Sequence, residues 1–452
     1  MRCGYGIWRG TAAVALVAVL TAPPAGATSL RDALVTTYLT SPRLEAGRSQ
    51  LRQVDENLPQ ALAGYRPNLF VNGDLTAERS TIRQGEVIEQ HRSGKSVNLT
   101  LRQNLYAGGG TQAQVSRAEN QVQAQRSRLY GLEQQVLLDT VDAYTAVYRD
   151  QSVLELALNN EERLQRQLEA TRDRFEVGEV ARTDVAQAEA RLSRAKADVE
   201  QAKADLASSR AAYERVIGEQ PTKLEEPKIL TDLPKTESET RAFAAQNPDI
   251  IAATFDLYAA RDNVDVAFSD LLPSLDLQGV LEYADQPTAQ VEWGRTAAFG
   301  LNLSIPLYQG GGEYARVRQN RQAVRERRDD LESAHRSVQE LVTSSWERLL
   351  AATAAIEAFR AEVRANQIAL EGVQQEALVG ARTVLDVLDA EQELFTSQVN
   401  LVRASREEIL ASYQLKLAVG QLTVEGLNLP VQAYNPVTYY EANRTRLFGL
   451  AE

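Results

Sequence analysis

Hydrophobic residues recur along most of this chain at helical spacing, over stretches much longer than the helices of ordinary globular domains. From Val115 onward they follow a three-and-four-residue spacing over about 65 residues, between Gly110 and Gly178. At the rise of an α-helix, such a stretch is on the order of 100 Å long. The pattern resumes after Gly178 and continues to Gly218. The sequence therefore predicts a long helical hairpin over 111–218.

A second long hairpin is predicted over 313–420, and its returning helix carries two apolar stripes. The first stripe contains Leu385, Leu388, Phe395, Val399, Val402 and Ile409, and the second contains Val387, Ala390, Leu394, Leu401 and Ala404. Seven-residue periods of this kind favour left-handed supercoiling. Because a helix with two apolar stripes needs neighbours on both sides, the pattern predicts a wall of helices.

Each hairpin is predicted to turn at a glycine. Gly178 and Gly380 stand where the chain must reverse, within turns at 175–184 and 377–386. Glycine suits these positions because it adopts the left-handed conformation that closes a helix at little steric cost.

Charged residues follow the second turn directly. Thr383 is placed to cap the outgoing helix. Asp386 and Asp389 lie three residues apart on one helical face, with Arg382 one turn away. On spacing alone, the usual interpretation of such a pair is a solvated helix face, and Arg382 with Asp184 could be no more than an exposed ion pair.

Alternating apolar and polar residues precede each hairpin. The alternation covers 66–78 and 95–106 in the first half of the chain, and 273–283 and 297–308 in the second half. Patterns with a period of two over about ten residues predict strands with one apolar and one polar face. Two interpretations remain open at this point: a half-exposed antiparallel sheet in a soluble protein, or strands that cross a membrane.

The whole pattern occurs twice. The sequence LYAGGG at 105–110 returns as LYQGGG at 307–312, an offset of 202 residues. Each copy opens with a predicted helix, at 30–64 and at 237–270. The chain is thus divided into a first repeat at 28–218, a linker rich in Pro and Glu at 219–236, a second repeat at 237–420 and a C-terminal segment at 421–452 that packs around the outside.

The first 27 residues have the pattern of a secretory signal peptide. A positively charged start is followed by an apolar stretch at 11–22 and an Ala-Gly-Ala cleavage motif before Thr28. The apolar stretch is too short to span a bilayer as a helix. The only cysteine of the sequence, Cys3, falls within the signal segment, so the exported chain is expected to carry no disulfide. The sequence predicts a location in the periplasm, outside the cell or in an outer membrane.

Charge and composition exclude several classes of function. The net charge is −12, and loss of Arg2 and Arg9 with the signal would leave 47 basic and 61 acidic residues, or −14. Such an acidic chain disfavours nucleic acid as a partner. The two histidines, His91 and His335, have no other ligands near them at metal-binding spacing. We therefore expect no catalytic residues, no metal and no cofactor.

The two triple-glycine sequences fit the loose fingerprint of a dinucleotide-binding turn. However, the preceding strands alternate between polar and apolar residues, whereas the buried parallel strand of such a site is nearly continuous in apolar residues. We interpret both as tight strand-to-helix turns. Their residues are Gly108, Gly109, Gly110, Gly310, Gly311 and Gly312.

The number of strands favours an oligomer. One chain supplies four candidate membrane strands, and an isolated four-stranded sheet would leave two unpaired edges in lipid. A closed barrel needs at least about eight strands. Three chains would supply twelve strands and enclose a lumen, although two or four chains also satisfy the arithmetic.

In this order and spacing, the features resemble the TolC-like outer-membrane efflux proteins. The resemblance rests on the duplication, the LYxGGG turns, the NP and SP openings, and the tip sequences FxVG…DVxxA and VGxRTxxDVLDAE. It implies a mainly α-helical homotrimer whose twelve-stranded β-barrel, in outer-membrane lipid, continues into a long α-helical barrel across the periplasm. It also implies the exit duct of a tripartite efflux or type I secretion system, with a periplasmic adaptor and a proton-driven or ABC transporter in the inner membrane.

The resemblance further implies roles for residues at the tips. Asp386 and Asp389 would form stacked acidic rings at the pore constriction, where like charges raise some pKa values and favour cations. Asp184 and Arg382 would tie the tip helices together in the closed state. The family often has a tyrosine where this chain has Ala377, so this network is expected to be weaker or built differently. The adaptor would contact Val177, Gly178, Glu179, Val379, Gly380 and Ala381.

A different class of function is also compatible with the helical pattern. A secreted or periplasmic coiled-coil scaffold, or an adhesin stalk without a pore, would show the same periodicity. Such a scaffold would be released from membranes by salt or an alkaline wash, whereas a barrel would require detergent.

Overall fold

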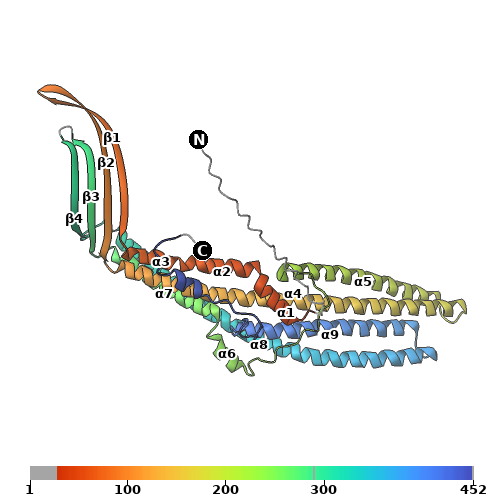
Figure 1. Ribbon diagram of the computed structural model, residues 1–452. Coiled ribbons are helices and arrows are strands. Elements are labelled where there is room, and N and C mark those ends of the chain that lie inside the picture. The colour runs from red at the N-terminus through yellow and green to blue at the C-terminus, as the bar shows by residue number, and fades with distance from the viewer. Residues whose placement is uncertain (1–27, 289–290, 450–452) are drawn as a thin grey trace, which may run out of the picture.

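The protein is elongated, with a four-stranded sheet at one end and a long bundle of helices extending from it (Figure 1). The computed structural model describes residues 28–288 and 291–449, so the predicted signal segment at 1–27 lies outside the described residues. Within the described part, no helix is both long enough and apolar enough to cross a membrane. The prediction of a mainly helical fold with four strands is confirmed.

Two helices run the full length of the bundle. α4 (Gly110–Glu176) and α8 (Gly312–Leu378) each contain 67 residues. α5 (Arg182–Ile217) and α9 (Val384–Ala418) return over the half that lies away from the sheet. The remaining helices are α1 (Leu30–Thr40), α2 (Pro42–Asp55), α3 (Asn57–Leu62), η1 (Ala63–Tyr65), α6 (Glu237–Ala244), α7 (Pro248–Ser269) and α10 (Thr438–Asn443).

The helix expected at the start of each repeat is broken in the structure, so the predictions of single helices at 30–64 and 237–270 were wrong. The breaks come at Ser41 and Asn247, whose ψ angles of 117° and 132° are extended. Each of these residues precedes a proline, and the proline ring disfavours the helical conformation of the residue before it. Pro42 and Pro248 then begin the next helix, where a missing N–H costs nothing.

The helices form a wall rather than a compact bundle. In the half away from the sheet, α5 packs on α4, α4 on α9, and α9 on α8 (Figure 1). In the half near the sheet, α7 packs between α4 and α8. The end helix α8 buries only seven of its 67 residues, whereas α4 buries 23. Among the described residues, one face of α8 therefore has no partner within a single chain.

The linker and the C-terminal segment wrap around the middle of this wall. Tyr144 of α4 is fully buried, and its hydroxyl lies 2.7 and 2.8 Å from the carbonyl oxygens of Thr28 and Glu225, to which it donates. From the C-terminal segment, the N–H of Val424 donates to the carboxylate of Glu133 at 2.9 Å. These hydrogen bonds hold Thr28, the linker and the C-terminal segment against α4. The sequence pattern of α4 did not predict these contacts.

The sheet is antiparallel throughout, in the order β1 (Asn68–Gln84), β2 (Glu86–Ala107), β3 (Ser274–Thr288) and β4 (Val291–Ser304). The first three strands extend further toward their turns than the sequence predicted, because polar residues beyond the apolar stretch still pair. β4 also begins earlier than predicted and ends at Ser304 rather than at 308, just before Pro306, which has no N–H to donate.

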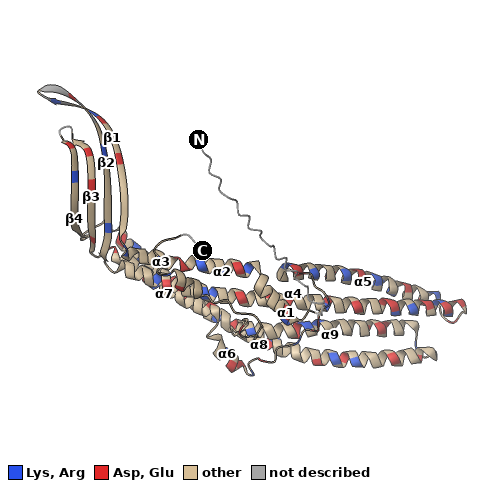
Figure 2. Cartoon of the chain, viewed as in Figure 1, with Lys and Arg blue, Asp and Glu red and all other residues tan. Residues whose placement is uncertain are grey.

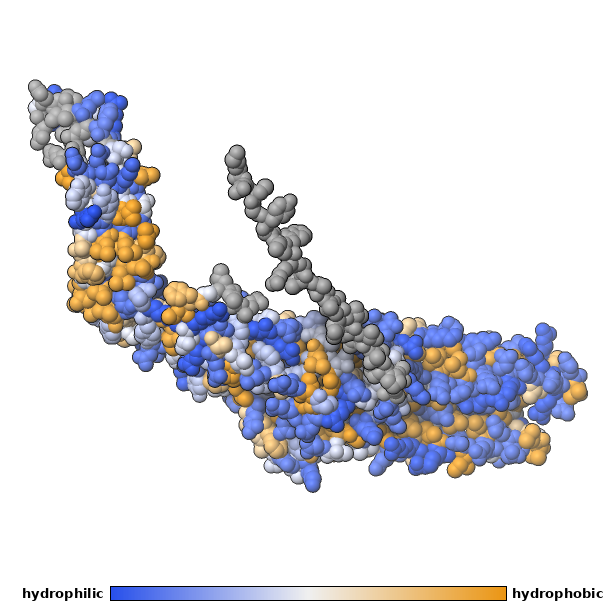
Figure 3. Space-filling model, viewed as in Figure 1, coloured by the Kyte–Doolittle hydropathy of each residue, from blue (hydrophilic) through white to orange (hydrophobic). Residues whose placement is uncertain are grey.

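The register places apolar residues of all four strands on one face. Val71, Leu99, Leu281 and Ala297 lie side by side on that face, and Asn72, Asn98, Glu282 and Thr296 lie side by side on the other. In Figure 3 the hydrophobic residues gather on the part of the sheet nearest the helices, and the far end is mostly hydrophilic. Figure 2 shows charges of both signs spread along the helical bundle and fewer on the strands.

Candidate functional site

The two hairpin tips have the same backbone construction. Gly178 and Gly380 have φ angles of +81° and +76°, which a side chain would disfavour. Beyond the first glycine, the N–H of Glu179 donates to the carbonyl of Arg174 at 2.9 Å. Beyond the second, the N–H of Ala381 donates to the carbonyl of Glu376, also at 2.9 Å. These bonds satisfy carbonyl groups that a helix end otherwise leaves unpaired.

Each tip also carries one ion pair across its own turn, with the polarity reversed between the two copies. In the first tip, Arg174 at the helix end pairs with Glu179 at 3.1 Å. In the second tip, Glu376 at the helix end pairs with Arg382 at 2.8 Å. The pKa of Arg382 is raised from its ordinary value, mainly by its hydrogen bond to Glu376. Within one chain, Arg382 therefore holds its own turn together.

Asp386 closes the N-terminus of α9. Its carboxylate accepts hydrogen bonds from the N–H and the hydroxyl of Thr383 at 2.9 and 2.8 Å, and the hydroxyl accepts from the N–H of Asp386 at 3.2 Å. This reciprocal arrangement is a capping box. The bonds from Thr383 lower the pKa of Asp386, with a smaller contribution from Arg382. Within one chain, the pKa of Asp386 is therefore lowered, whereas a ring of like charges would raise it.

Asp184 occupies the corresponding position at the start of α5. Its carboxylate accepts a hydrogen bond from the N–H of Ala181 at 3.0 Å. Arg382 is engaged with Glu376, so the structure does not bring Asp184 and Arg382 together within one chain.

The two hairpins are joined near their tips by an ion pair that the sequence did not predict. Arg191 of α5 donates to the carboxylate of Asp389 in α9 at 2.5 Å. The repeat contains one signal for it: Arg191 corresponds to Glu393 at the offset of 202 residues, so the two copies carry opposite charges there. Opposite charges at equivalent positions indicate that the two copies face different surroundings.

An apolar cluster supports this junction. Its buried members are Leu164 and Leu168 of α4, Ala188, Leu192 and Ala195 of α5, and Val384 and Leu388 of α9. Three helices from both hairpins therefore share one core directly behind the tips. The position of Asp389 is fixed by this packing as well as by its ion pair.

A cavity of about 560 Å³ lies beside this cluster, between the two hairpins. Ala377 and Leu378 of α8 line it, together with Thr171 and Arg174 of α4. Ala377 is the position where the resemblance implies a tyrosine. Because the alanine side chain ends at Cβ, no side chain from this position crosses the space between the hairpins.

The ends of the tips expose large apolar side chains. Val177 is 72% exposed, Val379 80% and Leu378 74%. Three such side chains at the far end of an otherwise polar bundle are typical of a contact surface for another protein.

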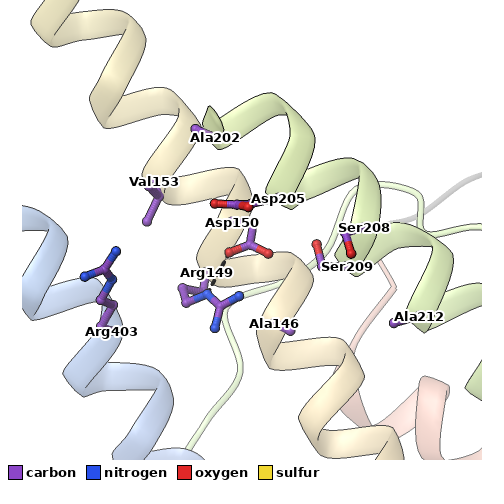
Figure 4. A pocket seen from close by; sticks show the side chains of 10 residues that line it. All are labelled: Ala146, Arg149, Asp150, Val153, Ala202, Asp205, Ser208, Ser209, Ala212 and Arg403. Carbon is purple, nitrogen blue, oxygen red and sulfur yellow. Dashed lines mark hydrogen bonds and ion pairs between the residues drawn. The ribbon is translucent and has the colours of Figure 1, made fainter. Parts of the chain in front are cut away.

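The polar cavity shown in Figure 4 lies farther from the hairpin tips, between α4, α5 and α9. It has a volume of about 490 Å³. Arg149 donates to the neighbouring Asp150 on α4 at 2.7 Å, and Arg403 lines the cavity from α9. Its lining contains neither histidine nor cysteine. Over residues 28–288 and 291–449, no group of three or more His, Cys, Asp or Glu is arranged to hold a metal ion. We assign no chemistry to this cavity.

The triple glycines connect strand to helix in both repeats. Gly108 and Gly109 have φ angles of +60° and +81°, and α4 begins at Gly110. Gly310 and Gly311 have φ angles of +72° and +86°, and α8 begins at Gly312. The first turn is tightly packed, because a Cβ on Gly108 would lie 2.7 Å from the carbonyl oxygen of Ser269.

Each repeat contains a strand pair, a glycine turn and a long hairpin. Each repeat also matches a known protein family. The family described as outer membrane efflux protein matches residues 34–219 and 241–421, one match in each repeat. The chain belongs to the outer membrane efflux protein family. It is therefore an outer-membrane channel protein that extends into the periplasm.

Individual relatives agree with this assignment. The outer membrane efflux protein BepC of Brucella suis is 36% identical over 434 residues, which cover 96% of this chain and 94% of the relative. The outer membrane protein TolC of Vibrio cholerae is 31% identical over 374 residues, covering 80% and 85%. The crystal structure of the outer membrane protein VceC of Vibrio cholerae has the same fold, with a TM-score of 0.77 and 18% identity over 86% of this chain and 96% of that one. None of these relatives supports a coiled-coil scaffold without a pore.

Proposed function

We propose that three copies of this chain form one channel, which serves as the exit duct of a tripartite efflux or type I secretion system. The four-stranded sheet with two open edges is the observation that carries this proposal. β1 and β4 each pair with one neighbour only, and both expose apolar side chains. Unpaired backbone groups cost several kcal/mol each in lipid, about 2–7 by transfer measurements. Pairing β4 of one copy with β1 of the next removes every open edge.

The helices support closure by the same route. α5 and α8 are the end helices of the wall, and α8 leaves Leu350 and Ile368 50% and 71% exposed. A wall whose end helix exposes apolar side chains is completed by another copy of itself. Twelve strands then continue into twelve helices around one axis.

The exposed tips suit a partner at the periplasmic end. Val177, Gly178 and Glu179, with Val379, Gly380 and Ala381, form the surface that an adaptor protein would contact. The adaptor would link the duct to a proton-driven or ABC transporter in the inner membrane. The duct itself needs no catalytic residue and no cofactor. Reconstitution of the purified protein in planar bilayers tests the channel: discrete conductance steps support it, and electrically silent protein correctly inserted in the bilayer contradicts it.

The acidic residues near the second tip are proposed to set ion selectivity. In a trimer, Asp386 and Asp389 would place six carboxylates around the mouth, and rings of carboxylates favour cations. Replacing both by alanine is expected to abolish the cation preference measured as the reversal potential in a salt gradient. The same variant is expected to lose block by multivalent cations. An unchanged reversal potential would show that the charges lie outside the pore.

The pH dependence of this selectivity follows from the capping box. The pKa of Asp386 lies below its ordinary value of 3.8, so its charge is retained as the pH falls and is lost only when the pH passes the lowered pKa. The stabilisation of the α9 N-terminus by this carboxylate is complete above the ordinary value of 3.8 and is lost as the pH falls through the lowered pKa. We expect equal cation preference at pH 7 and pH 5, and a decline only below about pH 4. If the cation preference were already lost at pH 5, repulsion between the carboxylates of the three copies would raise the pKa of Asp386 by more than the hydrogen bonds from Thr383 lower it.

The Arg191–Asp389 ion pair is proposed to hold the two hairpins of a chain together in the closed state. Arg191→Gln removes the charge and leaves a shorter, neutral side chain that is still polar. Exposed ion pairs contribute about 0.2–1 kcal/mol each, so losing all three pairs of a trimer, about 0.6–3 kcal/mol in total, is expected to raise the open probability at least about threefold. The matched control is Arg172→Gln, because Arg172 pairs with Glu189 inside the first hairpin at 2.6 Å. Equal single-channel behaviour of the two variants would remove Arg191 from the gate.

Arg382 and Asp184 remain gating candidates only through contacts between copies, since each is satisfied inside its own turn. An Arg382→Ser variant with the conductance of the closed wild-type channel would end that role.

A further inference from the structure

The C-terminal segment returns to the foot of the sheet. α10 is fixed first, because the hydroxyl of Tyr439 donates to Glu56 at 2.8 Å and the guanidinium of Arg126 lies over the Tyr440 ring at 4.8 Å. Beyond α10, the side chain of Arg66 donates to the carbonyl oxygen of Arg446 at 3.1 Å. Arg66 stands two residues before β1, so residues 444–449 lie where the strands meet the helices.

This segment exposes apolar side chains that no described part of the chain covers. Leu447 is 64% exposed and Phe448 is 89% exposed. The sequence from 442 to 449 is ANRTRLFG, with Arg444 and Arg446 and no acidic residue, in a chain whose net charge is −12. An aromatic and an aliphatic side chain next to two arginines form a short amphipathic segment that is locally basic.

The segment lies beside the start of the apolar face of the strands. The apolar face of β1 begins three residues after Arg66, where Leu69 and Val71 are 63% and 70% exposed. Tyrosines mark the same level: Tyr65 and Tyr106 are each about half exposed, at 52% and 50%. Tyrosine is enriched where the apolar band of a membrane protein meets the headgroups. Figure 3 shows that the hydrophobic part of the sheet is the part next to the helices.

We propose that residues 444–449 are a membrane anchor that inserts into the periplasmic leaflet of the outer membrane. Leu447 and Phe448 lie at the level of the upper acyl chains, and Arg444 and Arg446 lie at the phosphate groups of the phospholipids. Apolar side chains next to arginines are the composition that binds an anionic lipid surface in this way. The occupant of this surface is phospholipid, because the segment continues the apolar face that the strands already present to lipid.

The anchor makes use of a segment that contributes little to the core. It extends the membrane contact of each chain beyond the strands and fixes the level of the membrane at the strand-to-helix junction. The inference depends on the outer-membrane location, and it is independent of the transported substrate and of the gating proposed above.

A nitroxide label at residue 448 tests the anchor. Apart from Cys3 in the signal segment the sequence has no cysteine, so Phe448→Cys provides one labelling site in the exported protein. The labelled full-length exported chain is reconstituted in vesicles of phosphatidylethanolamine and phosphatidylglycerol. Collision rates are measured with oxygen, which concentrates in lipid, and with a water-soluble nickel complex. Leu75→Cys, on the lipid face of β1, is the lipid control, and Glu441→Cys, exposed on α10, is the water control.

At 448, the ratio of oxygen to nickel collisions is expected to be well above that at 441 and to approach that at 75. A ratio at 448 equal to that at 441 would place the segment in water and overturn the proposal. Low collision rates with both reagents would place residue 448 against protein, another copy of the chain included, and would overturn it as well. Conductance recorded on the same labelled protein separates failure of the channel from failure of the anchor.

Discussion

Replacing Gly108 by valine is expected to prevent assembly of the channel. Gly108 has a φ angle of +60°, a conformation that β-branched residues rarely adopt. Its Cβ would also lie 2.7 Å from the carbonyl oxygen of Ser269 and 2.7 Å from the Cβ of Leu272. The strain alone costs on the order of 1–3 kcal/mol. The clash adds to this cost, because both contacting atoms belong to the backbone or lie next to it.

The second repeat supplies matched controls for this change. Gly310 has a φ angle of +72°, but a Cβ added there would meet no atom within 4 Å, so Gly310→Val tests the strain without the clash. Gly312 begins α8 and its added Cβ would also meet nothing within 4 Å, so Gly312→Ala should assemble normally. The measurement is the yield of folded oligomer extracted from the outer membrane. We expect the yield to be highest for Gly312→Ala, lower for Gly310→Val and lowest for Gly108→Val. If Gly108→Val gave the same yield as Gly312→Ala, the turn at Gly108 would not be tightly packed.

An arginine on the apolar face of the sheet is expected to block membrane insertion, whereas the same change one residue later is expected to be tolerated. Val71 is 70% exposed on the face that carries Leu99 and Leu281. An arginine on the lipid-facing side of a strand costs up to about 2–4 kcal/mol per chain, with the largest cost at the middle of the bilayer. Asn72 points to the opposite face, where its amide donates to Asn98 at 2.9 Å.

Val71→Arg and Asn72→Arg therefore introduce the same charge at adjacent positions of one strand. The fraction of each variant that resists alkaline extraction of membranes measures insertion. We expect Asn72→Arg to remain near the wild-type level and Val71→Arg to fall well below it. If both variants inserted equally, the apolar face would not be in contact with lipid.

The sequence predicted those parts of the fold that depend on local periodicity. Seven-residue and two-residue patterns depend only on residues close together in the sequence. We could therefore locate the hairpins, their glycine turns and the strand segments without a structure. The strand ends could not, because the polar residues of 79–96 pair through backbone groups that carry no side-chain signal. The helix breaks before Pro42 and Pro248 follow from a local rule, and the sequence contained what was needed to find them.

The site was less predictable because its contacts join distant parts of the chain. Arg191 and Asp389 are 198 residues apart, and only the packing of α5 against α9 brings them together. The role of Asp386 was readable in part: threonine followed three residues later by an acidic residue is a capping signature, and that cap lowers the pKa of the carboxylate. The C-terminal segment has no periodicity, so its place beside Arg66 could come only from the structure.

The mass of the detergent-solubilised particle, with the bound detergent subtracted by light scattering, tests most directly whether one chain is part of a larger channel. We predict a particle of three chains that stays associated at nanomolar concentration and loses its solubility when the detergent is removed. A single chain that stays soluble and fully ordered without detergent, with the apolar face of its sheet protected from solvent, would contradict this.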